Sequence, residues 1–233
     1  MTIQEKVDII KNNIKESAEK SGRKGEDIFL LPVSKTKTPD EIREVLKTGI
    51  SAIGENYVQE FLTKYEVLKN EVSDFHFIGH LQSNKVKYII DKVSLIHSVH
   101  SLDLLNQINK RASALNKVQS VLIEVNFTKE ISKSGIFEEN LDSILYGAND
   151  LKNVKIRGLM MMPPASYNDE ELKKTFYDFN ILFNKKKDIL FGDNVSMEIL
   201  SMGMSHDYRI AIENGSNMVR IGSSIFGERN YNI

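Results

Sequence analysis

The strongest constraint on the fold of this chain is a pattern that repeats eight times along it. Each repeat begins with a short apolar run. After every run but the last comes a segment whose apolar residues have helical spacing. Such alternation is typical of parallel strands joined by crossover helices. The eight apolar runs cover residues 28–34, 51–56, 75–79, 94–99, 120–127, 155–162, 196–203 and 217–227.

Eight such units in a chain of 233 residues favour an α/β fold with a single closed (β/α)8 TIM barrel, near the short end of the usual size. A doubly wound open sheet is the alternative, but the sequence has no G-x-G-x-x-G motif after the first strand. No Pro-, Gly- or Ser-rich linker divides the sequence, so we expect one domain over residues 1–233. Within it, residues 1–22 are predicted to form an amphipathic N-terminal helix packed on the barrel.

Composition excludes several classes of function. The formal net charge of −1 gives no electrostatic reason to bind nucleic acid or a membrane. The absence of cysteine excludes disulfides, thiolate nucleophiles and thiolate metal sites. The sequence shows neither a signal peptide nor an apolar stretch of transmembrane length, so we expect a cytoplasmic protein.

Pro32 conflicts with the first predicted strand, because proline has no amide hydrogen for the strand ladder. We therefore expect a bulge or a local sheet edge at this position.

In a barrel of this type, ligands bind at the carboxyl ends of the strands. The first strand delivers Lys35 there, which is the one good nucleophile among the expected strand ends. The segments LSMGMS and RIGSS follow the seventh and eighth strands. Glycine lets the backbone approach an anion and serine adds hydroxyl donors, so these two loops together predict a phosphate site. The five histidines are scattered without metal-ligand spacing, and we predict no metal site.

Strand eight neighbours strand one in a closed barrel, so Lys35 and the phosphate site should face the same opening. A phosphorylated aldehyde bound there could form a Schiff base with Lys35. Alternatively, Lys35 could simply neutralise the phosphate charge, and the spacing does not separate these two possibilities.

Seven segments carry a further signal, in this order along the chain: VSKTK (33–37), GENYVQE (54–60), HFIGHLQSNK (76–85), SKSG (132–135), RGLMMMPP (157–164), LSMGMSHD (200–207) and VRIGSSIFG (219–227). Together they resemble the pyridoxal phosphate homeostasis proteins. The resemblance implies a fold-type III barrel like the N-terminal domain of alanine racemase. We expect no C-terminal β domain, because the chain ends at Ile233, shortly after the eighth strand.

The resemblance also implies pyridoxal 5′-phosphate (PLP) as the cofactor, bound as a Schiff base on Lys35. Asn56 would lie near the cofactor ring, and Arg220 matches the arginine that faces the pyridine nitrogen in alanine racemases. The alternative for Arg220 is a salt bridge to a phosphate or a carboxylate. The cofactor-binding residues implied are Lys35, Asn56, Ser201, Arg220, Gly222 and Ser223.

Two functions remain open for such a protein. The first is a non-catalytic, monomeric PLP-binding protein that stores, protects or delivers the cofactor, with PLP-dependent apo-enzymes as candidate recipients and with no catalytic residue. The second is a small PLP-dependent racemase or decarboxylase, with Tyr208 or His206 as the acid or base. The expected absence of the β domain, which supplies a catalytic tyrosine in racemases, favours the first. A phosphosugar enzyme with a Schiff-base lysine is the alternative if the resemblance is misleading.

Overall fold

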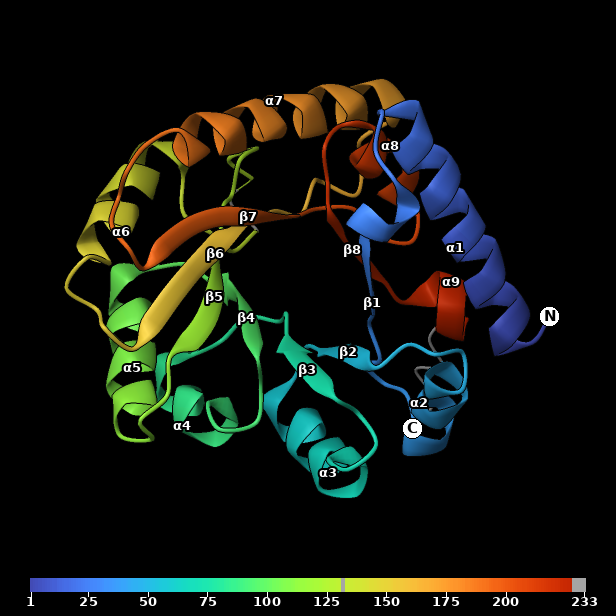
Figure 1. Ribbon diagram of the computed structural model, residues 1–233, viewed down its shortest axis with the longest axis horizontal. Coiled ribbons are helices and arrows are strands. Elements are labelled where there is room, and N and C mark those ends of the chain that lie inside the picture. The colour runs from blue at the N-terminus through green and yellow to red at the C-terminus, as the bar shows by residue number, and fades with distance from the viewer. Residues whose placement is uncertain (131–132, 228–233) are drawn as a thin grey trace.

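The computed structural model describes residues 1–130 and 133–227; Ser132, in one of the family-like segments, lies outside them. Its eight parallel strands form one sheet in the order β1-β8-β7-β6-β5-β4-β3-β2. The strands form a ring at the centre of the molecule and the helices lie outside it (Figure 1). The predicted (β/α)8 barrel is thereby confirmed. The strands are β1 (Phe29–Pro32), β2 (Ala52–Glu55), β3 (Asp74–Phe77), β4 (Leu95–Val99), β5 (Gln119–Glu124), β6 (Val154–Met160), β7 (Val195–Ser201) and β8 (Met218–Ile221).

Each segment with helical spacing contains a helix, and a short further helix follows β8. No helix in the described ranges is both long enough and apolar enough to cross a membrane. The α-helices are α1 (Ile3–Lys20), α2 (Pro39–Leu46), α3 (Val58–Leu68), α4 (Val86–Ile89), α5 (Leu102–Ser113), α6 (Leu141–Gly147), α7 (Asp169–Lys187), α8 (Tyr208–Glu213) and α9 (Ser223–Phe226). Three 3₁₀ turns are η1 (Gly25–Asp27), η2 (Ser83–Lys85) and η3 (Glu138–Asn140).

Helix α1 begins with a reciprocal cap. The Thr2 side chain accepts a hydrogen bond from the Glu5 amide, and the Glu5 carboxylate accepts one from the Thr2 amide. The helix buries Ile14 in the core. Its Asn13 side chain donates to the hydroxyl of Tyr208 at 3.0 Å, which fastens α1 to α8.

Pro32 lies at a seam in the barrel. On one side β1 pairs with β8 in a regular parallel ladder that includes Pro32 and Ile221. On the other side β1 meets β2, and among the described residues these two strands share only the isolated bridge between Val33 and Gly54. The missing proline donor therefore faces a gap in the ladder, so the predicted local edge is confirmed.

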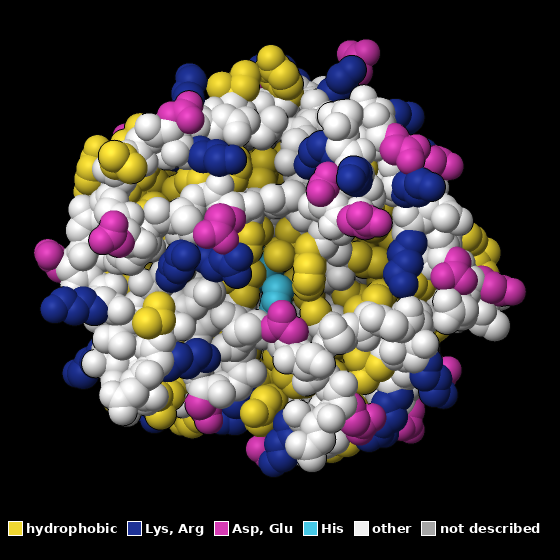
Figure 2. All heavy atoms as spheres, in the orientation of Figure 1, with side chains coloured by type: hydrophobic (Ala, Val, Ile, Leu, Met, Phe, Trp, Pro, Cys, Tyr) yellow, Lys and Arg dark blue, Asp and Glu magenta, His cyan; other side chains and the backbone are white. Residues whose placement is uncertain are grey.

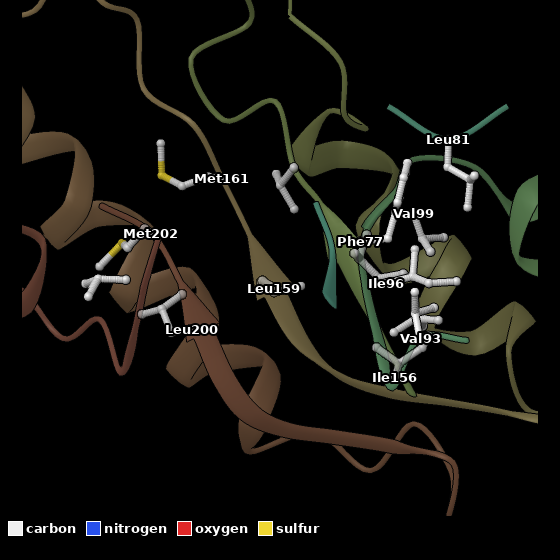
Figure 3. Close-up of a cluster of buried hydrophobic side chains, with 14 of the residues drawn as sticks. Phe77, Leu81, Val93, Ile96, Val99, Ile156, Leu159, Met161, Leu200 and Met202 are labelled. Atoms are coloured by element: carbon white, nitrogen blue, oxygen red, sulfur yellow. The ribbon is translucent and has the colours of Figure 1, made fainter. Parts of the chain in front are cut away.

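Most of the hydrophobic core lies between the strands and the surrounding helices, where Phe77, Ile96, Leu159 and Leu200 gather from four different strands (Figure 3). The next residue along a strand points to the opposite face, into the barrel. Inside the barrel the apolar side chains form two small separate clusters. One consists of Leu95, Leu122, Met160, Ile199 and Met218, and the other of Leu31, Val33, Ala52 and Ile78.

Candidate functional site

A cavity of about 220 Å³ opens at the carboxyl ends of β1, β2 and β8. Because β1 and β8 pair directly, the residues that follow these strands meet although they lie at opposite ends of the sequence. The cavity walls include five of the six predicted cofactor-binding residues: Lys35, Asn56, Arg220, Gly222 and Ser223.

Ser201, the sixth predicted residue, does not line this cavity. It is fully buried at the end of β7, and its hydroxyl oxygen accepts a hydrogen bond from Arg220 at 2.6 Å. Ser205 lines the cavity instead, and its hydroxyl oxygen accepts hydrogen bonds from the amides of Gly222 (3.2 Å) and Ser224 (3.3 Å). Both serines belong to LSMGMS. The sequence does not show that β7 ends at Ser201, which leaves Ser205 in the loop that follows.

Two glycines shape the loops at this end of the barrel. A Cβ atom on Gly222 would lie 3.3 Å from the carbonyl oxygen of Val33, so a side chain there would crowd β1 at the cavity. Gly203 has a φ of +96°, and a Cβ atom there would lie 2.6 Å from the Ala211 side chain. The loop from β7 into α8 therefore requires glycine at Gly203.

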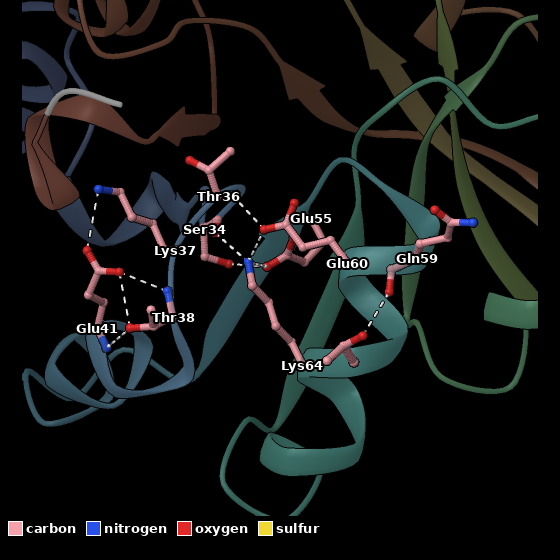
Figure 4. Close-up of polar contacts among 10 residues, drawn as sticks. Ser34, Thr36, Lys37, Thr38, Glu41, Glu55, Gln59, Glu60 and Lys64 are labelled. Carbon is pink, nitrogen blue, oxygen red and sulfur yellow. Dashed lines mark hydrogen bonds and ion pairs between the residues drawn. The ribbon is translucent and has the colours of Figure 1, made fainter. Parts of the chain in front are cut away.

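Charged side chains hold the turn that carries Lys35 in place through hydrogen bonds to its backbone (Figure 4). Thr36 has a φ of +64°, which is unfavourable for a β-branched residue. Its amide donates to Glu60 at 2.5 Å, and Lys64 donates to the carbonyl oxygen of Ser34 at 2.6 Å. These contacts fix the backbone on both sides of Lys35.

Lys64 and Glu55 form a buried ion pair beneath this turn, with 2.8 Å between nitrogen and oxygen. Burial raises the pKa of Glu55, while the Lys64 charge and a hydrogen bond from the Ser34 hydroxyl act in the opposite direction. Lys64 also pairs with Glu60 at 2.6 Å. Sequence analysis missed this network, although all three side chains lie within or just after GENYVQE.

Arg220 is a buried cation on the cavity wall. Burial lowers its pKa to about 10, and the charges of Asp207 and Glu124 partly oppose that effect. Arg220 is therefore protonated at neutral pH. Besides its bond to Ser201, it donates to the carbonyl oxygen of Met161 at 2.9 Å.

The remaining polar residues differ in their access to the cavity. Lys37 and His206 line it, whereas the Tyr208 hydroxyl is bonded to Asn13 of α1. Asn56 has a buried side-chain oxygen without a hydrogen-bond partner in the described part of the chain. Within residues 1–130 and 133–227, no cluster of three His, Cys, Asp or Glu side chains could hold a metal ion.

The family model described as "Alanine racemase, N-terminal domain" matches residues 6–230. A pyridoxal phosphate homeostasis protein of Aquifex aeolicus is 44% identical over 231 residues, covering 99% of this chain and 100% of that one. The protein of the same name from Escherichia coli K12 is 35% identical over 225 residues, covering 95% and 94%.

Two solved structures are also similar to this chain. PipY of Synechococcus elongatus, with PLP bound, superposes with a TM-score of 0.84 at 26% identity and covers 97% of this chain and 100% of its own. An alanine racemase of Clostridium difficile in complex with cycloserine has a TM-score of 0.71 at 17% identity, with coverage of 95% and 59%, and shows the shared fold alone. The chain belongs to the alanine racemase N-terminal domain family and, within it, to the pyridoxal phosphate homeostasis proteins.

Proposed function

We propose that this protein binds PLP in the cavity at the end of β1, with Lys35 as the attachment point, and stores, protects or delivers it within the cell. One observation carries the proposal: the amine-bearing Lys35 and the cation Arg220 line the same cavity from two paired strands. The names of the relatives and the PLP-bound structure of PipY support the choice of cofactor.

The residues on the cavity wall fit the groups of PLP. Gly222 leaves the backbone open to close approach, and Ser205 and Ser223 add hydroxyls beside it, which suits a phosphate group. The unsatisfied oxygen of Asn56 is an acceptor that a bound molecule would satisfy, which removes a cost of burial. When bound, the cofactor supplies a reactive aldehyde, and the Lys35 amine condenses with it to form a carbon–nitrogen double bond and release one water.

The lining of the cavity bears on the choice between a carrier and a catalyst. By the resemblance to alanine racemases, Arg220 would face the pyridine nitrogen, where a guanidinium, which only donates, would keep this nitrogen unprotonated and the ring a weaker electron acceptor. Alanine racemases catalyse with the same arginine, so the case for a carrier rests on the acid/base candidates. Tyr208 is engaged with Asn13 and is absent from the cavity wall, whereas His206 lines it. We propose that the protein has no catalytic residue, His206 included, and the amino-acid assays below test this.

Borohydride trapping tests the attachment point. After PLP is added and reduced, we expect the pyridoxyl mass on the peptide that contains Lys35, and no visible absorbance band or fixed mass on that peptide in Lys35→Ala. Lys37→Ala is the matched control, because Lys37 lines the same cavity; in this variant Lys35 should still carry the mass. Fixation of the wild-type protein at Lys37 or another lysine would contradict the assignment.

Two assays separate a carrier from an enzyme. We expect long incubation with each L-amino acid to change neither the enantiomer ratio nor the amount of carboxylate, and the loaded protein to restore activity in a PLP-dependent apo-enzyme. Racemisation or decarboxylation that depends on Lys35 would instead establish an enzyme. Size-exclusion chromatography with light scattering measures the mass of the protein in solution and tests the predicted monomer. The mass of a dimer would overturn that prediction.

A further inference from the structure

The barrel interior contains a polar layer where such barrels usually hold branched apolar residues. Each member of the layer stands two positions after a residue of the inner cluster that contains Leu95, and therefore points to the same inner face of its strand. All are buried. The members are His97 on β4, Glu124 on β5, Ser201 on β7 and Arg220 on β8.

A continuous run of side-chain hydrogen bonds leads from this layer towards the other end of the barrel. Arg220 Nη1 lies 2.6 Å from Ser201 Oγ, which lies 3.4 Å from His97 Nδ1. His97 Nε2 lies 3.1 Å from His76 Nδ1, and His76 Nε2 lies 3.1 Å from an Asp74 carboxylate oxygen. We call these five side chains the inner chain.

The far end of the inner chain reaches a second opening. A cavity of about 320 Å³ there is lined by Asp74 and His76 and by the first residues of β1, β4 and β8, namely Phe29, Leu95 and Met218. Figure 2 looks onto this end and shows a central hollow with a histidine side chain at its floor and an acidic side chain beside it. The inner chain thus joins the two openings of the barrel.

Donor chemistry gives the inner chain a single direction. A guanidinium can only donate, so the Ser201 oxygen accepts from Arg220. Among the described residues the Ser201 hydroxyl hydrogen has no other acceptor than His97 Nδ1. Burial and the nearby His76 and Arg220 hold the pKa of His97 well below its ordinary value, so His97 is neutral, carries its hydrogen on Nε2 and donates to His76. His76 in turn donates through Nε2 to Asp74.

The Asp74 end agrees with the same direction. Burial alone would raise the pKa of Asp74, but hydrogen bonds from His76 and Ser94 lower it below its ordinary value. Asp74 is therefore a carboxylate near neutral pH and can only accept. A donor-only group at one end and an acceptor-only group at the other leave one arrangement of hydrogens for two neutral histidines.

We propose that Asp74, His76, His97 and Ser201 are positioning residues that hold Arg220 through this directional chain, and that a proton added at the Asp74 end switches the histidine tautomers and alters the surroundings of Arg220. The consequence for the cofactor rests on the proposed function, because only then does Arg220 face PLP.

The switch follows from the number of hydrogens available. An added proton occupies His76 Nδ1, so His76 donates to both neighbours and His97 must move its own hydrogen from Nε2 to Nδ1. His97 and Arg220 then both donate to Ser201, whose own hydrogen loses its acceptor. Two charged side chains face His76 in this cavity: Asp74 on its own strand, and Arg157, which lines the cavity from β6 and is paired with Glu198.

Nitrogen-15 NMR of the histidine rings in the full-length, cofactor-free protein tests the arrangement of hydrogens. At neutral pH we expect hydrogen on Nε2, and none on Nδ1, in both His76 and His97. His100 is the internal control: its Nδ1 lies 3.0 Å from the carbonyl oxygen of Ser98, so it should carry hydrogen on Nδ1. Hydrogen on Nδ1 of His76 or His97 at this pH, or a protonated His97, would overturn the inner chain.

A second experiment tests the coupling to Arg220. Acidification of the wild-type protein should shift the Arg220 Nε–Hε signal, with the midpoint moved to lower pH in Asp74→Asn, which lacks the carboxylate that favours the added proton. His97→Gln should lose the shift, whereas His100→Gln, outside the inner chain, should keep it. A midpoint unchanged in Asp74→Asn would reject the coupling, and this variant decides the question if His97→Gln does not fold.

The PLP-loaded protein provides the last comparison. Its visible absorbance should change at the same pH midpoint as the Arg220 signal, and the midpoint should move in the same way in Asp74→Asn. An absorbance band that does not follow the Arg220 signal would reject the link to the cofactor. If no PLP binds at all, the proposed function fails, while the two NMR measurements still decide whether the inner chain exists.

Discussion

Glu124 is a carboxyl group buried inside the barrel, and one of its oxygens has no hydrogen-bond partner within the described residues. Burial raises its pKa to about 7, and the charge of Arg220 only partly offsets this. Near neutral pH the group is therefore divided between acid and carboxylate, unlike a surface glutamate.

Glu124 should make the folded state less stable as the pH rises. Its folded-state pKa is above its unfolded value of 4.5, so its contribution is fully present below about 4.5 and is lost as the pH passes 7. The loss is on the order of 3 kcal/mol. Urea unfolding at pH 5 and at pH 8 measures the loss of unfolding free energy between the two pH values, and this loss should be smaller for Glu124→Gln than for the wild type. Glu139→Gln, at an exposed position, is the control and should lose as much unfolding free energy as the wild type does. Equal losses in all three proteins would contradict the expectation.

Gly222→Val should weaken PLP binding, because its Cβ atom would lie 3.3 Å from the Val33 carbonyl oxygen and the added methyl groups would occupy space beside the cavity. Gly222→Ala should weaken binding less, since it adds only the first of these atoms. Titration with PLP, and competition by inorganic phosphate, would measure the order wild type, Ala, Val. Unchanged affinity in Gly222→Val would remove this glycine from the phosphate site.

At the scale of the elements, α1 provides the most direct measure of packing. Ile14 is buried against the barrel, whereas Ile9 on the same helix is 46% exposed. We expect Ile14→Ala to lower the free energy of unfolding by about 2–4 kcal/mol, since it removes buried methyl groups and leaves a cavity. Ile9→Ala is the matched control and should change it by less than about 0.5 kcal/mol. Urea denaturation measures both, and similar losses would mean that α1 does not pack as described.

The strands and helices were largely predictable because each follows from a local hydrophobic period. Short apolar runs predicted all eight strands, and Pro32 predicted a bulge or a local sheet edge in the first of them. Lys35 and the loops after β7 and β8 could be placed at one opening from strand order, whereas Arg220 was indicated only by the family resemblance. Ser205 could not, because its role depends on the path of the loop after β7, and neither could Lys64, because its partners come from two elements folded together.

At the scale of the whole molecule, PLP should stabilise the entire barrel. A ligand that binds only the folded state adds about 2.7 kcal/mol at a concentration one hundred times its dissociation constant. The melting temperature of the wild type should therefore rise with PLP concentration, and that of Lys35→Ala should rise less because the covalent attachment is lost. Equal increases in both proteins at every concentration would show that Lys35 contributes nothing to retention. Pyridoxine, which has no aldehyde, is the control ligand.

The pairing of β1 with β8 also determines when the site can exist during synthesis. The ribosome makes β1 among the first strands and β8 last, yet β1 forms its only regular ladder in the described chain with β8. Nascent chains therefore carry Lys35 on an unpaired strand until nearly the whole sequence has emerged, and non-local pairing of this kind closes late. The cavity that would hold PLP is complete only once β8 has paired with β1, so we expect specific loading to follow completion of the barrel.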